Sequence, residues 1–104
     1  MRFFTIATIQ EASDMDKIKT YKQKVEKNPD DADVHNGLGD AYYDSGMYEE
    51  AIESFKQAIK IDPDYAKAHH NLGIAYLQIN DRGSALEQYK ILKRTWYWNG
   101  EWTV

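Results

Sequence analysis

The sequence predicts a mainly α-helical fold: a helical-hairpin solenoid of five helices, with a short β segment at the N-terminus and a C-terminal β-hairpin. Three observations predict it. The chain repeats with a period of 34 residues, apolar residues recur at helical spacing within each repeat, and both ends are rich in aromatic and β-branched residues. We expect an extended segment over residues 1–12, a repeat domain over residues 13–94 and an aromatic tail over residues 95–104.

The repeat is visible as matching residues one period apart. Residues 32–65 form the first unit and residues 66–94 the second, and most matched residues are identical. The pairs are His35 with His69, Leu38 with Leu72, Gly39 with Gly73, Ala41 with Ala75, Tyr42 with Tyr76, Ala51 with Ala85, and Phe55 with Tyr89. Because glycine costs about 1 kcal/mol in a helix interior, its recurrence at one repeat position predicts a closely packed neighbouring helix.

Before the first full unit, the chain predicts half a repeat over residues 13–31. Pro29 stands one period before Pro63, and Ser13 is a suitable N-cap for a helix that ends near Pro29. The apolar residues of this helix recur at helical spacing, at Ile18, Tyr21 and Val25. We therefore expect the segment to be the second helix of a truncated repeat.

Each full unit predicts two antiparallel helices. In the first unit, Gly46 can adopt a positive φ and so ends the first helix. The second helix ends at Asp62-Pro63, because a residue before proline avoids the helical region. In the second unit Asn80, which tolerates the left-handed conformation, takes the place of Gly46.

These residues resemble the tetratricopeptide repeat family, whose repeats are helix–turn–helix units. The resemblance is carried by Leu38, Gly39, Ala41, Tyr42, Ala51, Phe55, Ala58 and Pro63, and by Leu72, Gly73, Ala75, Tyr76, Ala85 and Tyr89. Two departures stand out: His35 and His69 occupy the position where the family often has tryptophan, and Tyr97 stands where the closing proline is expected. The resemblance implies about two and a half repeats and a function in protein–protein interaction or scaffolding, without catalysis.

In this family the first helices of the repeats line a concave face on which peptide ligands typically lie. The resemblance implies that this role falls to Asp33, Asn36, Asp40, Tyr43 and Asp44 of the first unit, and to Lys67, His70, Asn71, Ile74 and Leu77 of the second. The three aspartates favour a basic ligand segment through their electric field. Some members clamp a ligand's C-terminal carboxylate with lysine and asparagine side chains. Here Asn71 matches one such position, whereas Asn36 and Asp40 do not match two others.

The two ends carry residues that the repeats do not explain. All three tryptophans lie in the tail, where Asn99-Gly100 is a strong signal for a hairpin turn. Because exposed strand edges pair with other chains, one hypothesis is an intermolecular sheet in a homodimer or larger homo-oligomer. The residues expected in it are Phe3, Phe4, Ile6, Trp96, Trp98 and Trp102. The alternative is that the hairpin folds back as a cap over the last helix.

The composition argues against several functional classes. Thirteen basic and 17 acidic residues give a net charge of -4, unlike the basic surface of a typical nucleic-acid-binding protein. The absence of cysteine excludes thiolate zinc sites and thiol catalysis. His69 and His70 point about 100° apart on a helix and are poorly placed to share a metal ion. We expect no catalytic residue, no metal and no cofactor. No apolar run approaches the roughly 18 residues that span a bilayer, so we expect no membrane partner and a cytoplasmic location.

Overall fold

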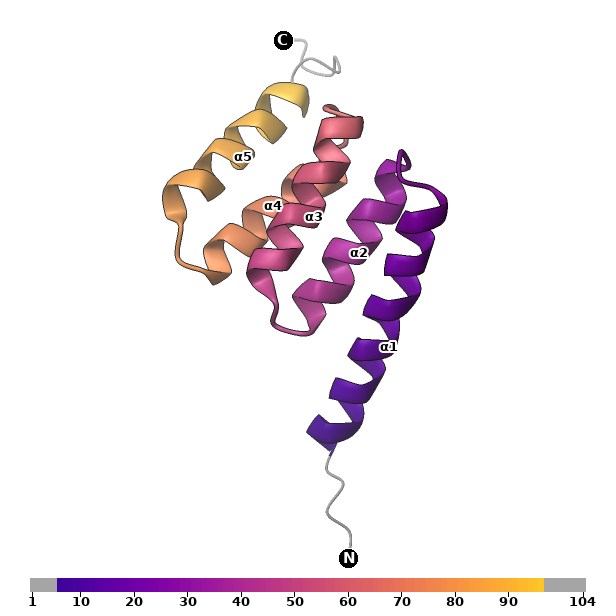
Figure 1. The fold of residues 1–104 in the computed structure, drawn as a ribbon. Helices are drawn as coiled ribbons and strands as arrows, with labels where there is room; N and C mark the ends of the chain where they lie inside the picture. The colour runs from indigo at the N-terminus through magenta and orange to yellow at the C-terminus, as the bar shows by residue number, and fades with distance from the viewer. Residues whose placement is uncertain (1–5, 97–104) are drawn as a thin grey trace, which may run out of the picture.

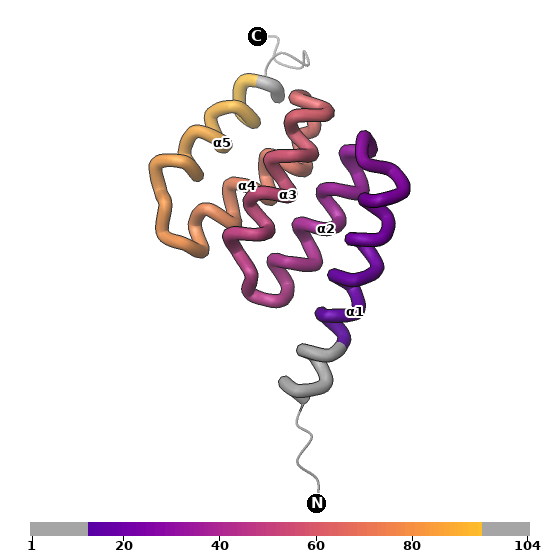
Figure 2. The backbone as a smooth tube through the Cα atoms, viewed as in Figure 1, coloured from indigo at the N-terminus to yellow at the C-terminus, as the bar shows by residue number. Residues whose placement is uncertain are grey.

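The computed structural model describes the backbone of residues 6–96 and the side chains of residues 13–94. Over this part of the chain the fold is entirely helical, and the helices stack one after another in chain order (Figure 1). They are α1 (Ile6–Lys27), α2 (Ala32–Asp44), α3 (Tyr48–Ile61), α4 (Ala66–Gln78) and α5 (Arg82–Trp96). Each helix packs on the next one along the chain, and α2 also touches α4. The smooth backbone trace in Figure 2 shows that α1 and α5 lie at opposite ends of the stack.

The predicted N-terminal β segment is wrong over the described residues. Residues 6–12 form the first turns of α1, which runs without a break to Lys27. Ala7, Gln10 and Glu11 all favour helix. The β-propensity of Ile6 is a weak preference that depends on a paired neighbouring strand, and no strand lies among residues 6–96 to provide one.

The predicted C-terminal hairpin is wrong at its start and is not described beyond it. Trp96 is the last residue of α5 rather than part of a strand, and Lys93 and Arg94 in the last turn favour the helix by their charge. Trp98, Trp102 and the turn at Asn99-Gly100 lie outside the described residues, as do Phe3 and Phe4. The hypothesis of an intermolecular sheet therefore has no strand within residues 6–96 to support it.

The turns between helices confirm the helix ends that the sequence predicts. Helix α2 begins after Asp31, whose side chain accepts a hydrogen bond of 2.9 Å from the backbone N–H of Asp33. Gly46 and Asn80 both adopt a positive φ, of 77° and 64°, at equivalent positions of the two units. Since glycine and asparagine are the residues that tolerate this conformation best, the same tight turn joins α2 to α3 and α4 to α5.

Two clusters of buried apolar side chains hold the helices together. The first joins α1 to α2 through Ile18, Leu38 and Ala41. The second joins α3 to α4 through Ala51, Ile52, Phe55, Leu72 and Ala75, with Tyr42 and Tyr43 of α2 packed against it. Because each cluster is built from consecutive helices, every unit is stabilised by its neighbour.

The close helix approach predicted from the two glycines occurs in the first unit only. A Cβ atom built on Gly39 would lie 2.4 Å from Cε1 of Phe55, which is fully buried between α2 and the helices beyond it. A Cβ atom on Gly73 would lie 3.5 Å from Cβ of Gln88, which is an ordinary contact distance. The two units share a sequence pattern, but their packing differs at this position.

This difference predicts opposite effects for the same substitution. Gly39→Ala forces the methyl group into the Phe55 ring, so we expect a lower free energy of unfolding, by about 1–3 kcal/mol. Gly73→Ala meets no obstacle and gains the helix propensity of alanine, so we expect a free energy of unfolding higher by up to about 1 kcal/mol. Urea unfolding followed by circular dichroism measures both. Equal effects of the two substitutions would contradict the packing described for α2 and α3.

Candidate functional site

The concave face is formed by α2 and α4, which touch each other although α3 lies between them in the sequence. All ten residues predicted for this face lie on these two helices. Asp40, Tyr43, Asn71 and Ile74 line one small cavity between them. The structure therefore brings the centre of the predicted set together. The remaining residues differ in their surroundings.

Hydrogen bonds between side chains connect α2 to α4 along this face. Asn71 Nδ2 donates to Asn36 Oδ1 at 3.1 Å and to Asp40 Oδ1 at 3.3 Å. Nearer the end of α2, Gln78 Nε2 donates to the Tyr43 hydroxyl at 2.9 Å. We call these bonds, with the bond from the Tyr65 hydroxyl to the Asp33 carboxylate, the polar seam.

The polar seam separates the predicted residues into structural and accessible ones. Asn36 is only 3% exposed, so its amide is a structural partner of Asn71 and is closed to a ligand. Asp33, Asp40 and Asp44 remain exposed on α2. The accessible part of the first unit is therefore a row of carboxylates, one per turn of the helix or nearly so.

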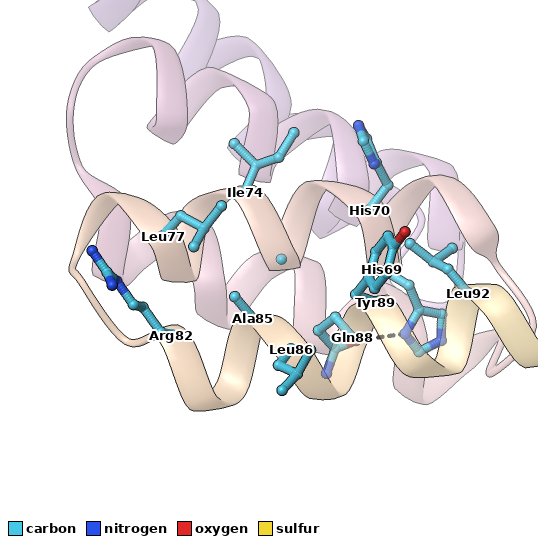
Figure 3. A pocket seen from close by; sticks show the side chains of 11 residues that line it. His69, His70, Ile74, Leu77, Arg82, Ala85, Leu86, Gln88, Tyr89 and Leu92 are labelled. Atoms are coloured by element: carbon cyan, nitrogen blue, oxygen red, sulfur yellow. Dashed lines mark hydrogen bonds between the residues drawn. The ribbon is translucent and has the colours of Figure 1, made fainter.

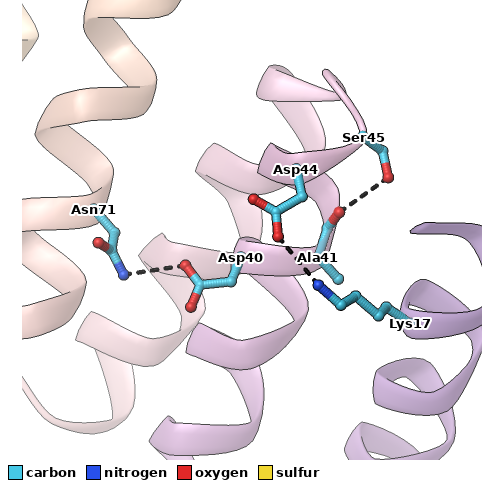
Figure 4. Close-up of polar contacts among 6 residues, drawn as sticks. All are labelled: Lys17, Asp40, Ala41, Asp44, Ser45 and Asn71. Carbon is cyan, nitrogen blue, oxygen red and sulfur yellow. Dashed lines mark hydrogen bonds and ion pairs between the residues drawn. The ribbon is translucent and has the colours of Figure 1, made fainter. Parts of the chain in front are cut away.

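The Asp44 carboxylate lies on the side of this row that faces α1. Lys17 Nζ is 3.4 Å from Asp44 Oδ2, and both side chains are about half exposed (Figure 4). Loss of surrounding water raises the pKa of Asp40 above its ordinary value, and the negative charge of Asp44 adds to the rise, whereas Lys67 and Lys17 oppose it. The row thus carries negative charge that is only partly compensated by the protein's own lysines.

The Tyr65 hydroxyl ends the row at the start of α2. Partial removal from water raises the pKa of Tyr65 to about 12, and its hydrogen bond to Asp33 and the negative charge of Asp33 contribute further. The phenol therefore stays protonated at neutral pH and acts as a hydrogen-bond donor to Asp33. This bond orients Asp33 but leaves its carboxylate exposed.

A second hollow, which we call the α4–α5 groove, lies on the far side of α4. It has a volume of about 500 Å³, and most of its lining is apolar. Figure 3 shows side chains of both helices around it, with Arg82 at one end and Leu92 at the other. It is lined by His69, His70, Gly73, Ile74, Leu77, Arg82, Ala85, Leu86, Gln88, Tyr89 and Leu92.

Sequence reasoning found only the α4 side of this groove. His70, Ile74 and Leu77 were predicted as concave-face residues, whereas Leu86, Tyr89 and the rest of the α5 side were not. One signal was available. Tyr89 replaces the phenylalanine of the first unit, and a hydroxyl at a core position indicates partial exposure.

The repeated histidines have a structural role. Nε2 of His35 lies 2.8 Å from the carbonyl oxygen of Pro29, and Nε2 of His69 lies 2.8 Å from that of Pro63, so each ring donates to the loop before its helix. His69 Nδ1 also bonds to the side-chain amide of Gln88 at 2.7 Å. Among the described residues, no group of three or more potential ligands could hold a metal ion.

Comparisons with known families identify the repeats. One family model, described as TPR repeat, matches residues 39–80, and another, described as Tetratricopeptide repeat, matches residues 20–53. Together they span more than half of the chain. Among curated proteins, no sequence matches this chain.

Solved structures share the fold. The crystal structure of MamA has a TM-score of 0.75 at 26% identity over 79% of this chain and 48% of that chain. A MamA fragment from Desulfovibrio magneticus RS-1 has a TM-score of 0.65 at 32% identity over 76% and 50%. The second TPR of Spaghetti (RPAP3), bound to the HSP90 peptide SRMEEVD, has a TM-score of 0.72 at 22% identity over 83% and 92%. The chain spans about half the length of these MamA chains.

The stacked helical hairpins and the open face of first helices define a repeat fold of the kind that serves protein–protein interaction. The chain belongs to the tetratricopeptide repeat family, as the matched models and the shared fold show. In the described part of the chain, none of the helices has the length and apolar character needed to cross a membrane.

The raised pKa of Asp40 predicts a pH-dependent effect of Asp40→Asn. Because the folded-state pKa lies above the unfolded value, the carboxyl stabilises the fold below its ordinary pKa of 3.8, and this contribution is lost as pH rises through the folded pKa. Asparagine keeps an acceptor for Asn71 without the charge. We expect Asp40→Asn to unfold at higher urea concentration than the parent at neutral pH.

The same two chains should unfold alike at a pH below the ordinary aspartate pKa, where the parent carboxyl is protonated. Glu87→Gln on the exposed face of α5 is the control, because the structure gives Glu87 no hydrogen bond or ion pair. A stabilising effect of Asp40→Asn that persists unchanged at low pH would contradict the electrostatic explanation.

Proposed function

We propose that this chain is a non-catalytic interaction module that binds a segment of a partner protein on the concave face of α2 and α4. The observation that carries the proposal is the composition of this face. Exposed carboxylates of α2 lie beside Ile74 and Leu77 of α4, and Leu77 is 55% exposed. An exposed large apolar side chain beside charged groups is typical of an interaction surface.

The charges on the face favour a ligand with basic and apolar residues. The ion pair of Lys17 with Asp44 is exposed, and such pairs contribute little to stability, so a lysine or arginine of the ligand can replace Lys17 at low cost. A positive charge near Asp40 offsets the loss of water around that carboxylate. Ile74 and Leu77 then accept an apolar side chain of the same ligand.

The peptide in the Spaghetti (RPAP3) structure supports the class of ligand but differs in charge. SRMEEVD is an acidic peptide. In this chain, Asp40 and the buried Asn36 stand where a clamp for a ligand carboxylate requires lysine and asparagine. A like charge next to Asp40 and Asp44 is unfavourable, so we assign the face to a basic segment instead.

A peptide selection tests this assignment. A random peptide library displayed on phage is selected against the full chain, and the dissociation constants of the selected peptides are measured as synthetic molecules. We expect lysine or arginine together with large apolar residues in the selected sequences. Leu77→Ser removes an apolar contact worth about 1–2 kcal/mol, so we expect binding to weaken about tenfold.

Two comparisons make the result specific to the face. Met15→Ser removes an equally exposed apolar side chain from α1, which lines none of the hollows described above, and we expect it to leave the affinity unchanged. The double variant Asp40→Asn with Asp44→Asn should weaken binding and flatten its dependence on salt. Peptides that bind these variants and the parent equally well would overturn the proposed face.

A further inference from the structure

The two units differ in what covers the outer side of their second helix. In the first unit, α4 packs over α3, and Ile52 and Phe55 are 6% and 1% exposed. One period later, Leu86 and Tyr89 of α5 are 52% and 61% exposed. These two side chains line the α4–α5 groove. The groove is therefore the place where the first unit receives α4 and where the second unit has no covering segment among the described residues.

The lining of the groove shows that a copy of α4 is a poor fit for it. In the first unit, Asp40 and Tyr43 of α2 receive the amides of α4 in the polar seam. One period later these positions are Ile74 and Leu77, which accept no hydrogen bond. The only charged residue of the lining other than histidine is Arg82. A suitable occupant is therefore apolar, carries few polar groups and has negative rather than positive charge.

We propose that residues 97–104 of the same chain fold back along the α4–α5 groove and cover it. The segment contains Tyr97, Trp98, Trp102 and Val104, and its one charged residue is Glu101. It thus has the apolar character of the groove and the charge opposite to that of Arg82. No strand or hairpin is required, because side chains seated in an apolar groove provide the contact.

The connection and the length of the segment suit this path. Helix α5 reaches its C-terminal end beyond Leu92, so the chain leaves it beside the groove, as the sticks in Figure 3 show for Leu92 and Arg82. The 15 residues of α5 span about 22 Å. Eight residues in extended form span about 26 Å, which is enough to follow the groove from Leu92 to Arg82.

A covered groove also affects the concave face, a consequence that rests on the proposed function. Ile74 and Leu77 belong both to that face and to the groove lining. A segment that packs on them competes with a ligand's apolar residue for the same two side chains. The covering segment therefore lowers the affinity for the ligand and regulates access to the apolar half of the face.

The tryptophans of the chain report directly on the proposal, because all three lie at positions 96, 98 and 102. In the full chain with Trp96→Phe, only Trp98 and Trp102 emit. We expect their fluorescence to be shielded from acrylamide, and Leu86→Asp in the groove to raise the quenching constant about twofold or more, because a weakened contact opens more often. Met15→Asp on α1 is the matched control and should leave the quenching constant unchanged.

Each outcome bears on the proposal. Tryptophans that are fully open to acrylamide in the parent, or that do not respond to Leu86→Asp, overturn it. Tyr89→Ser is measured in parallel with circular dichroism, so that a fold defect of Leu86→Asp is recognised and the test still holds. Shielding that disappears on dilution, with a mass above the monomer in sedimentation, assigns the groove to a second copy and also overturns it.

The regulatory consequence is separated from the proposed function by the selected peptides. We expect the full chain with Trp98→Ser and Trp102→Ser to bind them several-fold more tightly than the parent. Failure of all peptides to bind would count against the concave face alone, because the quenching result does not depend on a ligand. Unchanged affinity together with shielded tryptophans would overturn the competition.

Discussion

The ring of Phe55 lies against the backbone of Gly39, in space that any other residue at that position would fill with its own side chain. This contact brings α2 and α3 close together and leaves the rest of the ring to pack with Leu72 and Ala75 of α4. The stacking of three helices thus depends on one aromatic ring and one missing Cβ atom. Since the domain has few buried large side chains, the loss of this contact has no nearby substitute.

The close stacking is what makes the polar seam possible. Once α3 holds α2 and α4 side by side, Asn71 reaches both Asn36 and Asp40, and Gln78 reaches Tyr43. Bonds of this kind contribute about 1 kcal/mol each, but they orient the side chains that remain exposed. The row of carboxylates on α2 is therefore a fixed surface with a defined spacing, which is the property that recognition of an extended ligand requires.

The function that we propose follows from the difference between the units rather than from their likeness. The positions that form hydrogen bonds on α2 carry Ile74 and Leu77 on α4, and the ring that is buried in the first unit is the exposed Tyr89 in the second. One half of the molecule is therefore polar and closed, and the other half is apolar and open. A ligand or a segment of the chain itself gains most by packing on the second half, because apolar surface is still exposed to water there.

Periodicity alone predicts the helices, their order and the turns at Gly46 and Asn80, because spacing and backbone preference are local properties of the chain. The same local reasoning fails at residues 6–12, where a helix that already packs on α2 extends over residues with some β-propensity. Sequence also names the residues of the concave face, yet it does not distinguish the buried Asn36 from the exposed Asp40. Nor does it show that Gly39 meets a ring while Gly73 does not. Burial and partners depend on which helix lies across from a residue, and only the packed fold decides that.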